Sequence, residues 1–390
     1  MAVRNRFAEL LPEITGWRHD FHENPEILYE VHRTAARVAE LCESFGCDAV
    51  VSGIGRTGVV ALIHGKTNTS GRVIGLRADM DALPIHEITG AAYASKVVGK
   101  MHACGHDGHT SILLGAAKYL AETRNFDGTV ALIFQPAEEG GAGAKAMIDD
   151  GLMDRFGISE VYGLHNAPGL PVGQFAIRSG PLMASADEFT IRLTGKGGHA
   201  AEPHRSIDTT LVGCHIVVAL QSVVSRNIDP LDSVVVTVGT FQTDSSASNV
   251  IANTVVMEGT VRTLDNAARD LAEERVRAIV TSTAAAFGAQ VQIDYQRGYP
   301  VTVNAAQNTE YAAQAAAEVA GGVQRDIKPI MPAEDFSYML EARPGAYIFL
   351  GNGDSAMCHH PAYDFNDEAI PAGCSFFVTL VEQRLPLDLT

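Results

Sequence analysis

The sequence is short of positive charge. Its 390 residues include 29 lysines and arginines against 46 aspartates and glutamates, and the formal net charge is -17. Proteins bind nucleic acids and anionic membranes through concentrated basic surfaces. We therefore expect no nucleic-acid partner and no membrane partner.

Cysteines are few, and long apolar runs are missing. The six cysteines are scattered without the spacing of a disulfide framework, which is typical of a reducing compartment. No stretch approaches the ~18 consecutive apolar residues of a membrane span. Residues 1–20 also lack the uninterrupted apolar segment of a secretory signal. The protein is expected to be cytoplasmic.

The apolar content is sufficient for more than one hydrophobic core. Hydrophobic residues make up 46% of the chain and charged residues 19%, which is ordinary globular composition. A chain of 390 residues also exceeds the size at which a single core keeps growing. Two domains are expected.

Strand-like and helix-like segments alternate through the first half of the chain. Apolar strand candidates at 71–79, 128–136 and 159–168 are separated by segments with helical periodicity. The same alternation returns late in the chain and ends in a helical segment at 369–385. This pattern predicts an α/β fold with a mostly parallel sheet covered by helices on both faces.

The middle of the chain follows a different order. Residues 184–296 read as strand, helix, strand, strand, helix, strand, the βαββαβ order of a ferredoxin-like domain. We therefore expect one outer domain made of residues 1–183 and 297–390, with residues 184–296 inserted as a second domain.

Ten residues near position 100 are rich in side chains that bind metals. The segment MHACGHDGHT, residues 101–110, holds three histidines, a cysteine and an aspartate. Cys104 and His106 are too close in sequence to share a helix face. A tight turn at Gly105 can nevertheless bring a thiolate and an imidazole onto one cation. His102 and His109 are candidates for further ligands, for residues that orient ligands, or for plain polar groups.

Further ligand-type side chains follow three predicted strands. The residues at these strand exits are Asp79, Asp81, Glu138, Glu139 and His165, and a late loop adds His359 and His360. Ligands bind at the carboxyl edge of the strands in open α/β sheets, so this convergence predicts a metal site there. Adjacent glutamates in an extended segment diverge, so one can ligate a cation while the other faces a metal-bound water. The spacing does not say which glutamate has which role.

Together these segments resemble the M20 family of metal-dependent amidohydrolases and peptidases, and in particular its branch of N-acyl-amino-acid hydrolases. The motifs are RADMDALP, MHACGHDGH, PAEEGGAGA, GLHNAPGLPVG, TGKGGHAAEPH and AEDFS, and the resemblance extends over nearly the whole chain. It implies a homodimer or homotetramer that hydrolyses the amide bond of small N-acyl-amino-acid substrates. The inserted domain would be the lid and dimerisation domain.

The resemblance also implies roles for individual residues. Two divalent ions, zinc, manganese or cobalt, would be held by Cys104, His106, Glu139, His165 and His359. Glu138 would be the catalytic general base. His199 would reach the active site of a neighbouring subunit and hold the substrate, and Asn249 would be a second substrate contact. Asp81 and Glu334 would orient the ligands. The family usually has a proline where this sequence has Ala252, in the loop after Asn249.

Two functions of other classes are compatible with the same residues. Cys104 could be the nucleophile of a thiol hydrolase with a nearby histidine as its base, which leaves the paired glutamates without a task. A non-catalytic ligand-binding protein could keep the scaffold, but it would have no need of Glu138 as a base. The residues do not indicate which acyl group the substrate carries, or whether dipeptides are also cleaved.

Overall fold

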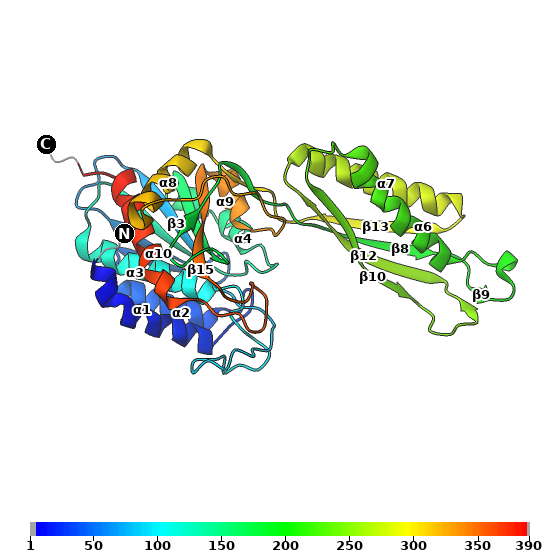
Figure 1. Cartoon of the computed structure of the whole chain (residues 1–390), viewed down its shortest axis with the longest axis horizontal. Coiled ribbons are helices and arrows are strands. Elements are labelled where there is room, and N and C mark those ends of the chain that lie inside the picture. Colours follow the sequence, from blue (N-terminus) through cyan, green and yellow to red (C-terminus); the bar gives the residue numbers. More distant parts are fainter. Residues whose placement is uncertain (1–4, 388–390) are drawn as a thin grey trace. The chain divides into compact units, whose positions relative to one another are not determined.

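The computed structural model describes residues 5–387 of the chain and divides them between two units (Figure 1). The first unit extends to Leu182 and also includes Val303–Lys328 and the chain from Asp335 onward. The second unit consists of Met183–Thr302 and Pro329–Glu334. Each unit has a hydrophobic core of its own.

A seven-stranded mixed sheet forms the centre of the first unit. In spatial order its strands are β1 (Ala49–Ile54), β2 (Gly58–His64), β4 (Thr129–Gln135), β3 (Val73–Asp79), β5 (Glu160–Pro168), β15 (Gly345–Gly353) and β6 (Phe175–Ala176). The four central strands β4, β3, β5 and β15 are parallel, as expected from the sequence. The outer pairings, β1 with β2, β2 with β4 and β15 with β6, are antiparallel.

The antiparallel edge was not anticipated from the sequence, and its cause is local. Gly55 and Arg56 have φ angles of +58° and +82° between β1 and β2. Positive φ at consecutive turn positions is typical of tight hairpins, which reverse the chain without a crossover helix. The two strands are therefore neighbours of opposite direction.

Two groups of helices pack against this sheet. One group contains α1 (Asn5–Glu23), α2 (His32–Ser44), α3 (His106–Thr123), α8 (Ala306–Ala320) and α10 (Ile370–Arg384), and the other contains α4 (Gly143–Asp149) and α9 (Phe336–Ala342). Helix α1 shows why these segments are helical. Its residues Phe7, Leu10, Ile14, Trp17 and Phe21 recur every three or four positions and are all buried.

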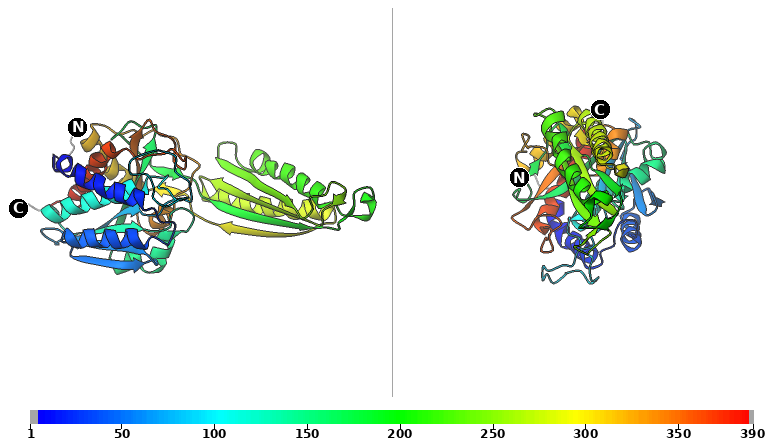
Figure 2. Two further views of the ribbon diagram at one scale, coloured as in Figure 1. Left: turned by 90° about the horizontal axis from the view of Figure 1, so that it is seen from below. Right: turned by 90° about the vertical axis from the view of Figure 1, so that its right-hand side faces the viewer.

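The second unit contains a four-stranded antiparallel sheet. Its order is β10 (Val234–Thr243), β12 (Thr254–Thr263), β8 (Asp187–Thr194) and β13 (Gln290–Arg297). Helices α6 (Thr209–Ser222) and α7 (Asn266–Ala286) pack together on this sheet (Figure 2). The Asp208 and Asp265 side chains accept hydrogen bonds from backbone N–H groups in the first turns of these helices, which fixes where each helix begins.

One helical stretch of the second unit is apolar on two sides. Residues Thr209–Asn227 are long and apolar enough to cross a membrane, a property that was not recognised in the sequence, and 33% of the stretch is buried. Val212 and Ile216 face the core of the unit, whereas Leu211 and Val218 are 49% and 71% exposed. The stretch therefore belongs to a packed core and also adds apolar side chains to the surface.

Candidate metal centre and active site

The turn between Cys104 and His106 starts the site. Gly105 precedes α3 with a φ of +85°, in the left-handed region that favours glycine. A Cβ atom at this position would lie 2.4 Å from Nδ2 of Asn166 and 2.5 Å from the hydroxyl of Tyr363. Only glycine fits this position. Its left-handed backbone lets the chain turn sharply, so that Cys104 and His106 both face the same space.

The five side chains predicted as metal ligands come together in the first unit. Donor atoms of Cys104, His106 and His165 lie within 4.8 Å of one another, and so do those of Cys104, Glu139 and His359. The Sγ atom of Cys104 is 3.4 Å from Nε2 of His165. Cys104 belongs to both groups, so the two sets of donors adjoin.

Buried atoms without hydrogen bonds indicate that this cluster fits cations. Within residues 5–387, neither ring nitrogen of the buried His106 has a hydrogen-bond partner, and the carboxylate oxygens of Asp79 and Asp81 that face them are 3.7 Å away. A buried polar atom without a partner is costly, and a bound cation removes that cost. Thiolate, imidazole and carboxylate donors together suit zinc, manganese or cobalt.

The two glutamates are held through their own backbone N–H groups, and their side chains have different surroundings. The Asp81 carboxylate accepts hydrogen bonds from the N–H groups of Glu138 at 2.9 Å and Glu139 at 3.1 Å. Oε1 of Glu138 accepts from the N–H of Asp335 at 3.4 Å. Glu139 faces Cys104 and His359, whereas Glu138 lies between His106 and Asp335.

A buried arginine connects two acids around the site. Arg77 donates to Oδ2 of Asp79 at 2.7 Å and to Oδ1 of Asp335 at 3.0 Å. Gln135 donates to both oxygens of Asp335, at 2.8 and 2.9 Å. Sequence reasoning missed Arg77 and Asp335. A single arginine within an otherwise apolar strand was the available signal for the first.

Neighbouring acids control the protonation of His106. Burial lowers its pKa, but the charges of Asp79, Asp81 and Glu139 outweigh burial and raise the pKa to about 10. The same negative charge attracts a dication. Imidazole ligands must be deprotonated, so a cation would displace the proton on binding.

The thiol of Cys104 does not have the properties of an independent nucleophile. A hydrogen bond with the Cys358 thiol, burial and the Glu139 charge all raise the pKa of Cys104 well above its usual value. Catalytic thiols have lowered pKa values. Although His165 is within reach as a base, this environment argues against the thiol-hydrolase alternative.

The other two histidines of the MHACGHDGHT segment have different surroundings, and the ring nitrogens of the buried His102 also lack hydrogen-bond partners among residues 5–387. His109 has Nδ1 2.6 Å from Oδ1 of Asp79 and accepts at Nε2 from the N–H of Asn166 at 3.0 Å. Both nitrogens of His109 are thus engaged, although His109 also lies with Asp79 and His106 in a group of donor atoms close enough to hold an ion. Burial lowers the pKa of His102 to about 3, so His102 is neutral.

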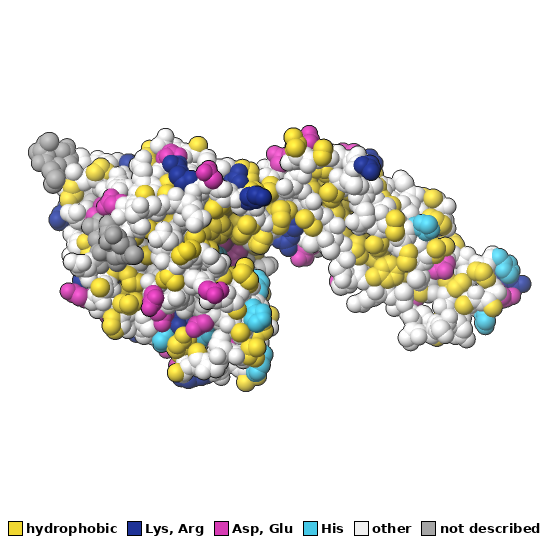
Figure 3. Space-filling model, in the orientation of Figure 1, with side chains coloured by type: hydrophobic (Ala, Val, Ile, Leu, Met, Phe, Trp, Pro, Cys, Tyr) yellow, Lys and Arg dark blue, Asp and Glu magenta, His cyan; other side chains and the backbone are white. Residues whose placement is uncertain are grey.

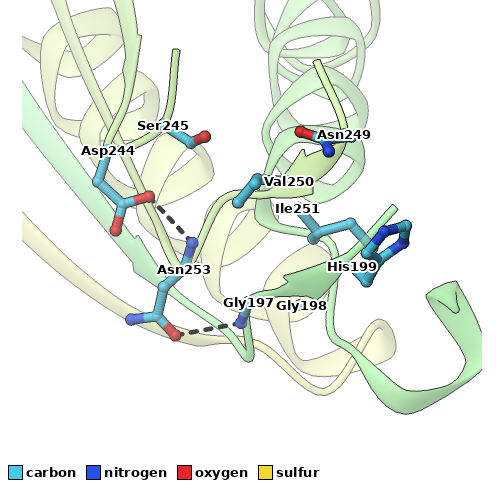
Figure 4. Close-up of a pocket in the computed structure, with 9 residues that line it drawn as sticks. All are labelled: Gly197, Gly198, His199, Asp244, Ser245, Asn249, Val250, Ile251 and Asn253. Atoms are coloured by element: carbon cyan, nitrogen blue, oxygen red, sulfur yellow. Dashed lines mark hydrogen bonds between the residues drawn. The ribbon is translucent and has the colours of Figure 1, made fainter. Parts of the chain in front are cut away.

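The predicted substrate-binding residues lie in the second unit. His199 pairs with Val250 in a short ladder between β9 (Gly198–His199) and β11 (Val250–Ile251), and the N–H of Ala200 donates to the carbonyl of Asn249 at 3.0 Å. His199 and Asn249 line one open pocket together with Gly197, Gly198, Asp244, Ser245, Val250, Ile251 and Asn253 (Figure 4). His199 is exposed. Glu334 is also in the second unit, where it is buried and directly precedes Asp335.

Comparison with known proteins identifies the family. Residues 75–383 match the sequence model of the family described as Peptidase family M20/M25/M40. Hippurate hydrolase of Campylobacter jejuni is 41% identical over 379 residues, which cover 97% of this chain and 98% of that enzyme. N-acetyl-L-cysteine deacetylase of Bacillus subtilis is also 41% identical, covering 97% of this chain and 89% of the relative.

Solved structures agree with this assignment. The Bacillus subtilis YxeP protein, described as a dinuclear metal-binding peptidase from the M20 family, is 34% identical with a TM-score of 0.84. The similarity covers 97% of this chain and 99% of that one. The chain belongs to the M20 peptidase family, and it is an amidohydrolase.

Proposed function

We propose that the protein hydrolyses the amide bond of N-acyl amino acids at a centre of two divalent cations. The proposed ligands are Cys104, His106, Glu139, His165 and His359. The observation that carries the proposal is the meeting of these donor atoms around Cys104, with the Glu138 carboxylate beside them. The relatives named as a hippurate hydrolase and an N-acetyl-L-cysteine deacetylase support this substrate class.

The proposed mechanism assigns proton transfer to Glu138. When bound, two dications would supply polarisation of the amide carbonyl and a water of lowered pKa. The Glu138 carboxylate takes a proton from the attacking water and returns it to the leaving nitrogen. The N–H of Asp335 and the Asp81 carboxylate hold Glu138 in place for both transfers.

For residues 184–296 we propose the role of lid and dimerisation domain. His199 and Asn249 would contact the substrate of a neighbouring subunit in a homodimer or homotetramer, and Glu334 would orient the ligands. The shared pocket of His199 and Asn249 supports a common task. Exposed apolar side chains over α6 and β10 support association through the second unit (Figure 3).

The proposed location is the cytoplasm. All six cysteines are free, including Cys104. A thiol that ligates a cation must stay reduced, and cytosolic thiols are kept reduced.

A substrate panel tests the proposed function. Benzoyl, acetyl and indole-acyl amino acids, together with dipeptides, would be assayed with manganese, zinc or cobalt by the amine released. We expect N-acyl amino acids to be cleaved in a metal-dependent reaction. Glu138→Gln should lower kcat by roughly 10²- to 10⁴-fold while the metal content stays the same. Chelator-resistant turnover with an acyl adduct on Cys104 would instead establish the thiol hydrolase.

A further inference from the structure

The side chain of Asn166 is buried beside the ligand cluster, with all of its polar groups engaged. Its Nδ2 group donates to the Cys104 carbonyl at 2.6 Å and lies 3.1 Å from Nε2 of His109. Its Oδ1 atom accepts from the Tyr363 hydroxyl at 2.8 Å and lies 3.9 Å from the Cys358 thiol. The single lone pair of His109 Nε2 is shared with the backbone N–H of Asn166 at 3.0 Å, so the main partners of the side-chain amide are the Cys104 carbonyl and the Tyr363 hydroxyl.

Each of these partners belongs to a segment that carries a proposed ligand. Asn166 itself follows His165 on β5, and Cys104 is a ligand whose carbonyl Asn166 holds. His109 lies three positions after His106 at the start of α3, so it shares that helix face. Cys358 directly precedes His359. One amide thereby connects the three chain segments that supply four of the five ligands.

The remaining ligand is fixed by a different group. Glu139 is held through its backbone N–H by Asp81. Asn166 therefore has a distinct task, which is to hold the thiolate and imidazole side of the cluster. An aspartate of the same shape has no side-chain N–H to donate, so the Cys104 carbonyl would lose its donor, whereas Nε2 of His109 would keep the backbone N–H of residue 166.

We propose that Asn166 is a positioning residue that sets the ligand geometry of the cation centre. This inference rests on the proposed function, because it assumes that the clustered side chains bind cations. Loss of the amide would release the Cys104 turn from β5, the strand that carries His165. Outer groups that orient metal ligands typically contribute 10- to 100-fold, as an order of magnitude, to metal affinity.

Cobalt binding to the full-length protein tests the proposal without relying on activity. Asn166→Ala and Asn166→Asp should weaken Co²⁺ binding by about 10- to 100-fold and alter the thiolate-to-cobalt absorption band. The matched control is Asn308→Ala. Asn308 is also buried and donates to Glu160 and Tyr162 near the start of β5, so its loss should reduce stability but leave cobalt binding unchanged.

The outcomes separate this inference from the proposed function. Asn166 variants that bind Co²⁺ with wild-type affinity and spectrum overturn the positioning role. A wild-type protein that binds no Co²⁺ overturns the cation centre and the positioning role together. If the Asn166 variants do not fold, Tyr363→Phe decides, because it removes only the hydroxyl that donates to Asn166. We expect a smaller weakening and a shifted band, and an unchanged spectrum and affinity would overturn the proposal.

Discussion

The Nε2 atom of His359 lies 3.2 Å from Oε1 of Glu139, and His359 adopts this position with a φ of +68°. A left-handed backbone is uncommon for a residue other than glycine, and such strain concentrates at functional sites. The local conformation thus turns the imidazole toward the ligand cluster. The adjacent His360 is exposed like His359, but its Nδ1 accepts from the N–H of Ala362 at 3.0 Å and takes no part in the ligand cluster.

This difference predicts unequal effects for two neighbouring substitutions. His359→Ala should weaken metal binding by more than the roughly 10- to 100-fold expected for an outer group, because it removes a donor atom. His360→Ala is the matched control and should retain full metal content and turnover. Metal content after dialysis and titration with Co²⁺ provide the measurement. Equal losses in the two variants would contradict the assignment of His359.

The carboxylate of Asp81 predicts a linked loss of stability and turnover. Asp81→Ala leaves the N–H groups of Glu138 and Glu139 without their acceptor, which should cost about 2–4 kcal/mol of unfolding free energy. The two glutamates would also lose their fixed orientation, so kcat should fall at least about tenfold. Urea unfolding and initial rates measure the two effects. Asp81→Asn keeps one acceptor oxygen and should lose less stability than Asp81→Ala.

The central strands and the proposed ligands could be predicted from the sequence, whereas the pairing of the outer strands could not. Periodicity identified the central strands and most long helices, and the parallel centre followed because helices separate those strands. The side chains whose donor atoms meet could be identified from local motifs. Cys104, Glu139 and His165 all lie at strand exits or helix starts, which can be located from the sequence. The antiparallel pairing of β1 with β2 depends on turn geometry at Gly55 and Arg56, which strand periodicity does not report.

The supporting residues were harder to predict. Asn166, Arg77 and Asp335 act through hydrogen bonds to positions far away in the sequence, and no spacing rule connects them to their partners. The sequence is compatible with three roles for His109: a further ligand, a residue that orients ligands, or a plain polar group. Only its contacts with Asp79 and Asn166 show that both nitrogens are occupied.

A buried ion pair predicts how stability depends on pH. Nδ1 of His22 lies 2.8 Å from Oδ2 of Asp107. Burial lowers the pKa of His22, but the charge and hydrogen bond of Asp107 outweigh burial and raise it from 6.5 to about 9. Because the folded pKa is the higher one, this stabilisation is complete below pH 6.5 and is lost as the pH rises through 9.

The expected loss is at most about 3.5 kcal/mol of unfolding free energy, given about 1.36 kcal/mol for each unit of pKa shift. Urea unfolding at several pH values between 6 and 10 would measure it. His22→Gln should flatten this pH dependence. His32→Gln serves as the control, because the His32 side chain is 69% exposed, and it should keep the wild-type slope. If the unfolding free energy of His22→Gln depended on pH as in the wild type, the His22–Asp107 pair would not be the cause of this dependence.

The exposed side of α6 predicts the surface used for association. Val218 is 71% exposed on a helix whose other side is buried in the core of the second unit. Val218→Asp would place a charge in the proposed interface, so it should shift the sedimenting species from dimer to monomer without lowering the melting temperature. Val98 in the first unit is 88% exposed, and Val98→Asp is the matched control. A Val218→Asp protein that sediments as the wild type does would exclude this surface.

Mixed dimers test whether His199 serves the neighbouring subunit. His199→Ala and Glu138→Gln should each lower kcat/KM strongly when present in both subunits. If His199 acts across the interface, a mixed dimer contains one site with Glu138 intact and His199 supplied by the other subunit. Activity should then return when the two variant proteins are unfolded, mixed and refolded together, and the amine released would measure it. If His199 acts within its own subunit, both sites of the mixed dimer lack one group and mixing restores nothing. The variants refolded separately are the controls, since each should remain inactive.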